Sequence, residues 1–272
     1  MELIKKGELE YYVFEGIERT GIVGHCFTTR LGGVSEGHLA SLNLGFSRGD
    51  KKENVDRNFD IICSAIGTEK ENCVTLRQVH STKIVKAGKD LRGMGFRDDM
   101  ERIEADGLIT NERGVTLVTF HADCVPLYFV DAKNKAIGMA HSGWRGTADK
   151  MAVEMLRRMN AEYGTDPKDV AAAIGPSIGP CCFQVDRPVV DIFRGNFDFA
   201  DKYIRDDENV KGKYKIDLWG INREMLERAG VKAENIEVGG ICTMCRPDEF
   251  YSHRVMGEAR GTMGAFLFFE MR

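Results

Sequence analysis

Two apolar runs near the middle of the chain constrain its fold more than any other feature. The segments 114–121 (GVTLVTFH) and 125–131 (VPLYFVD) are almost continuously apolar. A strand with one face toward water alternates apolar and polar residues, whereas a strand buried on both faces does not. We therefore expect these segments to be central strands whose two faces are both covered by other parts of the chain.

Segments with helical periodicity can supply part of that cover. Apolar residues recur at steps of three to four in 55–66, 147–163 and 218–229, which predicts amphipathic helices. Ser, Thr, Asp and Asn are favoured at the residue before a helix, where their side chains accept hydrogen bonds from free N–H groups. The expected N-caps are Asp50, Thr147 and Asp217.

Shorter apolar segments predict the remaining strands. These are 9–15, 21–29, 72–80, 105–110, 135–141, 170–175, 236–242 and 265–270. Short strands mixed with dispersed helices predict an α+β fold with a mixed β-sheet core flanked by helices, in which sandwich-like packing is one option. Because we find no internal repeat and no Pro- or Ser-rich linker, we expect a single domain over residues 1–272.

The charge balance excludes several classes of protein. The chain has 38 Lys+Arg, 42 Asp+Glu and a net charge of -4, so we expect no nucleic-acid partner bound by a broad basic surface. Hydrophobic residues make up 43%, too many for a disordered chain. No segment approaches the about 18 apolar residues of a membrane helix, and no apolar secretory signal is recognisable. We therefore expect a cytoplasmic protein without a membrane partner, and the oligomeric state stays open.

Three predicted strand ends carry reactive side chains. His80 ends one strand, Cys124 follows another, and His141 ends a third. Strand ends and the loops after them are common positions for functional residues. The spacing matches no local metal motif such as HExxH or paired CxxC, so the residues alone leave open a shared site or three packed structural side chains. Arg145, near a predicted helix start, adds a cation where an anion could bind.

Several motifs occur in an order that resembles a known family. The motifs are SLNLGFSRGD (41–50), RQVHS (77–81), ADGLIT (105–110), ADCVPLYFVD (122–131), AHSGWRGT (140–147) and AIGPSIGPCCFQV (173–185). Together they resemble the YfiH/YlmD family, which was long named for polyphenol oxidase or laccase activity and is related to zinc-dependent purine nucleoside phosphorylases. The resemblance covers roughly residues 20–270 and implies a YfiH-like (laccase-domain) catalytic fold.

The resemblance implies that His80, Cys124 and His141 jointly bind a catalytic Zn²⁺. Imidazole nitrogen and thiolate sulfur are zinc ligands, and three protein ligands leave a fourth position for water, phosphate or substrate. The implied reaction is phosphorolysis of adenosine, inosine or S-methyl-5′-thioadenosine, with adenosine deamination as a second activity. The implied partners are therefore small molecules, a purine nucleoside and phosphate.

Neighbouring residues have two interpretations each. Asp123 could orient a ligand imidazole or act as a base, or it could be a turn residue at a strand end. Arg145 could bind the anion or be a solvated arginine. Asn43 and Gln78 could bind the sugar or base, or they could satisfy buried backbone groups.

Two positions depart from the pattern of the relatives. His121 stands where relatives often have Thr, Ser or Tyr. It could contact metal or substrate as a further nitrogen or proton shuttle, or it could point away, because strand residues alternate faces. His253, in YSHR where relatives often have YSYRR, could replace an aromatic wall of the pocket.

Three alternative functions remain open. Cys124 could be the nucleophile of a metal-independent cysteine hydrolase, with His80 or His141 as its base. A copper-dependent polyphenol oxidase follows from the family name; six histidines are too few for a multicopper centre, although copper could occupy the site in vitro. A non-enzymatic zinc protein in envelope quality control would need a structural site with four protein ligands.

The other paired cysteines give weaker signals. Cys242 and Cys245 have CxxC spacing but lack the thioredoxin-like context of a redox motif. Cys181 and Cys182 follow two Gly-Pro pairs, and the absence of GK[ST] argues against a P-loop. We interpret the latter pair as part of a turn near the pocket.

Overall fold

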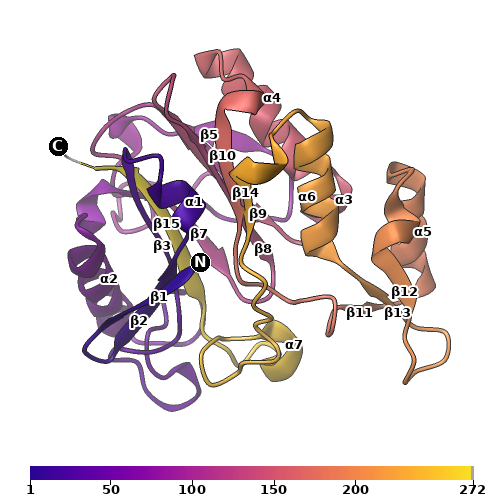
Figure 1. Ribbon diagram of the computed structural model, residues 1–272. Helices are drawn as coiled ribbons and strands as arrows, with labels where there is room; N and C mark the ends of the chain where they lie inside the picture. The colour runs from indigo at the N-terminus through magenta and orange to yellow at the C-terminus, as the bar shows by residue number, and fades with distance from the viewer. Residues whose placement is uncertain (271–272) are drawn as a thin grey trace.

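The computed structural model describes residues 1–270 and consists mainly of two six-stranded sheets packed face to face (Figure 1). The strand order is β1-β2-β3-β15-β7-β4 in the first sheet and β14-β10-β8-β9-β6-β5 in the second. Helix α2 covers the outer face of the first sheet, and α3, α4 and α6 cover the outer face of the second. The result is a four-layer arrangement of helix, sheet, sheet and helices.

The first sheet consists of β1 (Glu2–Lys6), β2 (Leu9–Val13), β3 (Val23–Thr28), β4 (Cys73–Thr75), β7 (Thr116–His121) and β15 (Met263–Phe269). The second consists of β5 (Ile84–Lys86), β6 (Gly107–Thr110), β8 (Val125–Asp131), β9 (Ala136–Ser142), β10 (Val170–Ile174) and β14 (Ile236–Val238). A small third sheet contains β11 (Gln184–Val185), β12 (Ile204–Asp206) and β13 (Tyr214–Ile216). The α-helices are α1 (Glu15–Glu18), α2 (Lys52–Ile66), α3 (Trp144–Ala148), α4 (Met151–Tyr163), α5 (Arg187–Asn196), α6 (Leu218–Arg228) and α7 (His253–Met256).

Both large sheets are mixed. In the first sheet β4 runs parallel to β7, and in the second β5 runs parallel to β6 and β10 to β14. The other neighbouring strands are antiparallel. The predicted α+β fold with a mixed sheet core is therefore confirmed, and the two sheets pack as a sandwich.

The central strand β8 shows why its sequence is apolar throughout. Tyr128 and Val130 face the first sheet and belong to the core between the two sheets. Val125, Leu127 and Phe129 point the other way and pack in the core beneath the helices. All residues of β8 are buried, which confirms the expectation that both faces of this strand are covered.

The predicted strand 72–80 is shorter than expected. β4 ends at Thr75, and His80 lies in a loop with a positive φ of 61°. The backbone N–H groups of residues 79–81 bind the carboxylate of Asp106 instead of a neighbouring strand. These residues therefore have a tertiary hydrogen-bonding partner where the apolar pattern predicted a strand.

Two of the predicted N-caps have different outcomes. Asp217 caps α6, since its carboxylate accepts a hydrogen bond from the N–H of Gly220 at 3.0 Å. The prediction for Asp50 is wrong, because Lys51 is the cap residue of α2. The carboxylate of Asp50 instead binds side chains of the loop that precedes this helix.

The prediction that Thr147 starts a long helix is also wrong. The helix begins earlier, at Trp144, and Thr147 lies inside α3 with its hydroxyl 3.0 Å from that of Ser142. Lys150 adopts a left-handed conformation with φ 63°, which separates α3 from α4. The apolar period continues through this break, so periodicity alone does not reveal it.

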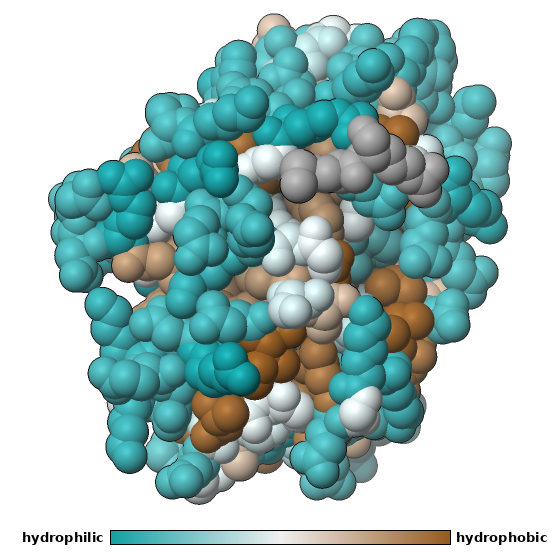
Figure 2. All heavy atoms as spheres, turned by 90° about the vertical axis from the view of Figure 1, so that its left-hand side faces the viewer, coloured by the Kyte–Doolittle hydropathy of each residue, from teal (hydrophilic) through white to brown (hydrophobic). Residues whose placement is uncertain are grey.

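Hydrophilic side chains cover most of the molecular face beside α2, and hydrophobic atoms show mainly in its lower half (Figure 2). Within residues 1–270, no helix combines the length and the apolar sequence needed to span a bilayer.

Candidate metal and catalytic site

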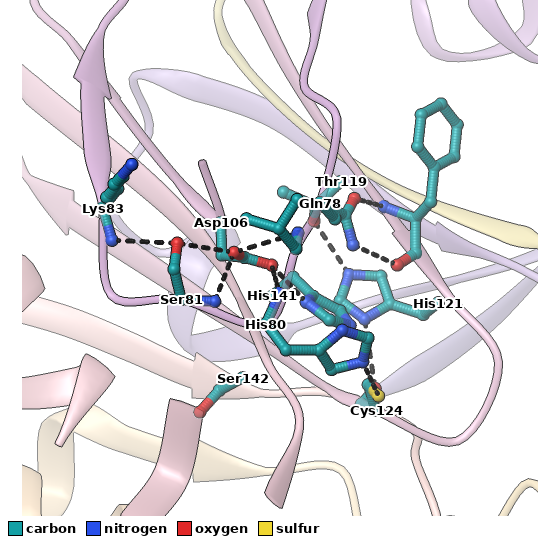
Figure 3. A network of polar contacts seen from close by, with 12 residues as sticks. Gln78, His80, Ser81, Lys83, Asp106, Thr119, His121, Cys124, His141 and Ser142 are labelled. Atoms are coloured by element: carbon teal, nitrogen blue, oxygen red, sulfur yellow. Dashed lines mark hydrogen bonds and ion pairs between the residues drawn. The ribbon is translucent and has the colours of Figure 1, made fainter. Parts of the chain in front are cut away.

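Three reactive side chains meet at the ends of the central strands (Figure 3). His141 is the second-last residue of β9, and Cys124 directly precedes β8, whose pairing with β9 sets Pro126 opposite His141. His80 reaches them from the loop after β4, with its Nε2 3.9 Å from Cys124 Sγ. The ligand atoms of the three residues all lie within 4.8 Å of one another. The structure thus brings together the residues that we predicted as zinc ligands.

Asp106 holds this arrangement, although our sequence analysis did not single it out. Its fully buried carboxylate accepts hydrogen bonds from the N–H groups of Val79, His80 and Ser81 at 3.2, 3.0 and 2.6 Å. Its Oδ1 also lies 2.9 Å from His141 Nδ1. One carboxylate therefore fixes both the His80 turn and the His141 ring. The available signal was an aspartate immediately before an apolar strand, in the motif ADGLIT.

The contact with Asp106 determines which nitrogen His141 can offer. A carboxylate accepts hydrogen bonds, so Nδ1 carries the proton and Nε2 is left for a metal. Burial lowers the pKa of His141, but Cys124 and Asp106 outweigh burial and raise it to about 9. Burial raises the pKa of the Cys124 thiol, but His141 and His80 outweigh it and lower it to about 6. The site therefore favours a thiolate at Cys124, which is the form that binds metals.

Gly143 keeps the space beside the site open. A Cβ atom at this position would lie 3.0 Å from Cys124 Sγ and 3.0 Å from His80 Cδ2. The φ of Gly143 is −62°, a value that any residue adopts. The side chains of the site, and not the backbone, therefore require glycine here.

His121 lies beside the three residues but has both ring nitrogens engaged. Its ring centroid is 5.4 Å from that of His141, so the alternative that it points away from the site is wrong. Its Nδ1 donates to the Cys124 carbonyl at 3.0 Å, and its Nε2 lies 2.8 Å from Thr119 Oγ1. Burial and the neighbouring His141 lower the pKa of His121 well below its usual value, so His121 supports the site as a neutral side chain. A contact between it and substrate stays a prediction.

Asp123 points toward the C-terminal segment instead of toward a ligand imidazole. Its carboxylate accepts hydrogen bonds from Thr243 Oγ1 at 2.6 Å, Ser252 Oγ at 3.0 Å and Arg254 N at 2.7 Å. The orienting role that we predicted for Asp123 therefore belongs to Asp106. Asp123 fastens the C-terminal segment next to the site, and its role as a base stays a prediction.

The two amides predicted to bind substrate are bound to the protein itself. Gln78 donates to the carbonyl of Phe120 at 2.8 Å and accepts from its N–H at 2.6 Å, which continues the pairing of β7 where β4 has ended. Asn43 is fully buried, and its amide binds the side chain of Asp50 and the N–H of Thr262. For both residues the structure favours the alternative interpretation, in which they satisfy buried polar groups.

Two hollows meet at His80 and Cys124. The smaller has a volume of about 230 Å³ and contains His121 in its wall. The larger has a volume of about 420 Å³, and Arg145 and His253 line it. The guanidinium of Arg145 lies 4.2 Å from the ring centroid of its neighbour Trp144. The smaller hollow is also lined by four arginines that no sequence motif indicated, namely Arg48, Arg77, Arg102 and Arg260.

Comparison with known proteins places this arrangement in a family. Residues 24–270 match the sequence model of the family described as multi-copper polyphenol oxidoreductase laccase. The chain belongs to this laccase-type family. It is 37% identical over 242 residues to the purine nucleoside phosphorylase YlmD of Bacillus subtilis, covering 89% of this chain and 86% of that protein. It is 40% identical over 243 residues to YlmD of Geobacillus stearothermophilus, covering 89% and 87%.

Solved structures of laccase-type relatives have the same fold. The YfiH protein of Bacillus licheniformis superimposes with a TM-score of 0.90 at 33% identity, covering 98% of this chain and 99% of that one. YlmD from Geobacillus stearothermophilus superimposes with a TM-score of 0.89 at 35% identity, covering 99% of each chain. The resemblance to the YfiH/YlmD family and the predicted YfiH-like fold are therefore confirmed.

The laccase-type family name implies a metal, and the donor set of this chain can hold one. Two imidazole nitrogens and one thiolate suit zinc or copper. The hydrogen bond from His141 Nδ1 to Asp106 is the partner that a metal-binding histidine usually has. Three ligands leave a coordination position open, which is typical of catalytic sites.

Proposed function

We propose that this chain is a zinc-dependent purine nucleoside phosphorylase. The observation that carries the proposal is the convergence of His80, Cys124 and His141 in a chain whose relatives are named purine nucleoside phosphorylases. Those names also favour an enzyme over a binding protein. The proposed substrates are phosphate and adenosine, inosine or S-methyl-5′-thioadenosine. The products are a free purine base and a pentose 1-phosphate.

His80, Cys124 and His141 would hold the zinc, and Asp106 would orient two of these ligands. Bound there, zinc supplies a Lewis acid that polarises an oxygen of phosphate, sugar or water.

The smaller hollow is the proposed phosphate site. Arginines supply its charged lining, and no Asp or Glu occurs among the described residues that line it. A guanidinium binds phosphate through two parallel hydrogen bonds. The arginines are needed at the site because the chain as a whole, with a net charge of -4, does not attract an anion. Arg48 and Arg260 line both hollows and so stand where phosphate and nucleoside would meet.

A phosphate oxygen attacks C1′, the C1′–N9 bond breaks, and its electron pair leaves with the purine, which takes up a proton.

The larger hollow is the proposed nucleoside site. Its wall contains the apolar side chains of Trp144, Ile178, Phe183 and Leu218, which suit the faces of a purine ring. Its volume of about 420 Å³ lies within the range of small-molecule sites. Arg145 lies in the wall of this hollow, and we propose that it is a further cation that binds the anion.

Adenosine deamination is the proposed second activity. The three-ligand set leaves a position for water, which is the observation that favours it. In this reaction water adds at C6 of the base, the C6–N bond breaks, and ammonia leaves.

Chromatography of adenosine incubated with the pure, metal-loaded protein tests both activities. We expect adenine and ribose 1-phosphate only when phosphate is present, and inosine with or without phosphate. Cys124→Ala and His141→Ala should lose both metal and turnover, whereas Cys63→Ala, on the buried face of α2, should keep both. The proposal is wrong if neither adenine nor inosine forms.

A metal-independent cysteine hydrolase is the second candidate, because the neighbouring histidines lower the pKa of Cys124 to about 6 despite its burial. Metal analysis combined with alkylation separates the two candidates. If the metal-free protein turns over adenosine at the full rate and alkylation of Cys124 abolishes this turnover, the thiol enzyme replaces the zinc-dependent phosphorylase.

A further inference from the structure

We propose that Cys181, Cys182, Cys242 and Cys245 form a second metal site, a closed structural zinc centre separate from the site at Cys124. The Sγ atoms of the four residues all lie within 4.8 Å of one another. The proposed phosphorylase reaction uses none of them, and the two sequence motifs that contain them are about 60 residues apart in the chain.

The sulfur–sulfur distances fit a metal better than a disulfide. Cys245 Sγ lies 3.3 Å from Cys182 Sγ and 3.6 Å from Cys181 Sγ, and all four thiols are free. Tetrahedral Zn–S bonds of about 2.3 Å place neighbouring sulfurs about 3.8 Å apart. The sulfurs of a disulfide are only about 2.05 Å apart. Small side-chain movements would therefore complete a tetrahedron.

The backbone brings the two cysteine pairs together without help from a metal. Cys181 and Cys182 follow β10, and Cys242 and Cys245 follow β14, which pairs with β10 in parallel. The chain therefore leaves both strands at the same edge of the second sheet. Beyond the strands, Ser177 forms a β-bridge to Cys242, and its carbonyl accepts a hydrogen bond from the N–H of Thr243 at 3.0 Å.

Local contacts at Cys242 also suit a metal-bound thiolate. The N–H of Gly179 donates to Cys242 Sγ at 3.2 Å, and such a bond stabilises negative charge on sulfur. A Cβ at Gly179 would lie 3.1 Å from Cys242 Cβ and 2.7 Å from the Trp219 ring, so glycine permits this close approach. Cys242 is buried, whereas Cys181 and Cys245 are exposed, which leaves the cluster accessible to an ion.

Four thiolates are the ligand set of a structural zinc site, because they leave no position for substrate. Binding would release the thiol protons to solvent, and the divalent ion would offset only part of the charge of the four thiolates. The link would fasten the segment after β14 to the turn after β10. That segment carries Thr243, which binds Asp123 beside Cys124, and the turn carries Ile178 and Phe183 of the larger hollow. The second zinc would therefore support the wall of the proposed nucleoside site.

Metal content of the purified full chain tests the inference. After expression with added zinc, we expect about two zinc ions per chain in the wild type. The double variant Cys182→Ser/Cys245→Ser should lose one ion and keep the other, and Cys124→Ala should lose the other. Cys63→Ala, the matched control, should keep both. Wild-type zinc content in the Cys182/Cys245 double variant overturns the second site, whereas wild-type zinc content in Cys124→Ala overturns the first site and leaves the second standing.

Thiol footprinting of the wild type keeps the inference testable if the double variant does not fold. Exposed free thiols react rapidly with iodoacetamide, so protection of Cys181 and Cys245 that ends when a zinc chelator is added supports the site. Buried Cys26 should react only after denaturation, which provides an internal comparison. Rapid labelling before the chelator is added, or a disulfide among these residues in the intact mass, overturns the inference.

Discussion

At the residue scale, the Asp106 carboxylate connects the turn that carries His80 to the ring of His141. Asp106→Asn keeps the size of this side chain but removes its charge and replaces one acceptor oxygen by a donor that faces other donors. We expect zinc affinity at the site to fall by about 10- to 100-fold. We also expect the free energy of unfolding to fall by about 1–3 kcal/mol. Competition with a chromogenic chelator measures the affinity, and urea unfolding measures the stability.

Asp149→Asn is the matched control, since Asp149 is an exposed carboxylate just after α3. It should change neither zinc affinity nor stability. Unchanged zinc affinity in Asp106→Asn would show that the buried carboxylate does not position the ligands.

Individual residues also show what the sequence could and could not predict. The resemblance to the YfiH/YlmD family implied that His80, Cys124 and His141 bind a metal, whereas their spacing alone did not, and the structure brings these three together. The orientation of a polar side chain depends on partners that are distant in sequence. The sequence made Gln78 a plausible substrate ligand, but in the structure its amide pairs with the backbone of β7. Asp106 was missed for the same reason, because its partners lie in other segments.

At the scale of single elements, α3 begins against the site, and the glycine just before it, Gly143, has closer neighbours than the glycine inside it, Gly146. A Cβ at Gly143 would lie 3.0 Å from Cys124 Sγ and 3.0 Å from a carbon of His80, whereas the nearest atom to one at Gly146 is 3.6 Å away. We expect Gly143→Ala to displace the ligands and to lower both zinc occupancy and turnover by about 10-fold or more. Metal analysis and initial rates measure the two effects.

Gly146→Ala provides the comparison within the same helix. It should keep zinc and activity, and it should raise the free energy of unfolding by up to about 1 kcal/mol, because alanine favours a helix over glycine. Equal activity in the two variants would contradict the steric role of Gly143.

Element boundaries followed sequence patterns only where local interactions set them. The apolar runs predicted β7 and β8, because burial on both faces leaves a clear composition signal. The end of β4 and the break at Lys150 had no such signal. Beyond β4, residues 79–81 bind Asp106 instead of a strand, and at Lys150 a single left-handed residue breaks the helix without interrupting the apolar period.

At the scale of the whole molecule, contacts between segments far apart in the chain create sites that local motifs do not show. The pairs Cys181–Cys182 and Cys242–Cys245 each gave a weak motif, and only the parallel pairing of β10 with β14 places them together. The packing of the first sheet against the second buries His25 of β3. Its Nε2 accepts a hydrogen bond from the N–H of Phe14 at 2.7 Å, and its ring lies edge-on to Tyr128 of the second sheet.

This burial makes the stability of the molecule depend on pH. Burial lowers the pKa of His25 from 6.5 to about 4, so between these values the unfolded chain binds a proton that the folded chain does not. The contribution of His25 to stability is therefore complete above pH 6.5 and is lost as the pH falls toward about 4. The loss amounts to at most about 3 kcal/mol. Urea unfolding of the wild type and His25→Gln, which keeps an acceptor for Phe14 but does not titrate, measures it. The stability advantage of the wild type should shrink between about pH 7 and about pH 4.5, and a constant difference would mean that another group causes the acid sensitivity.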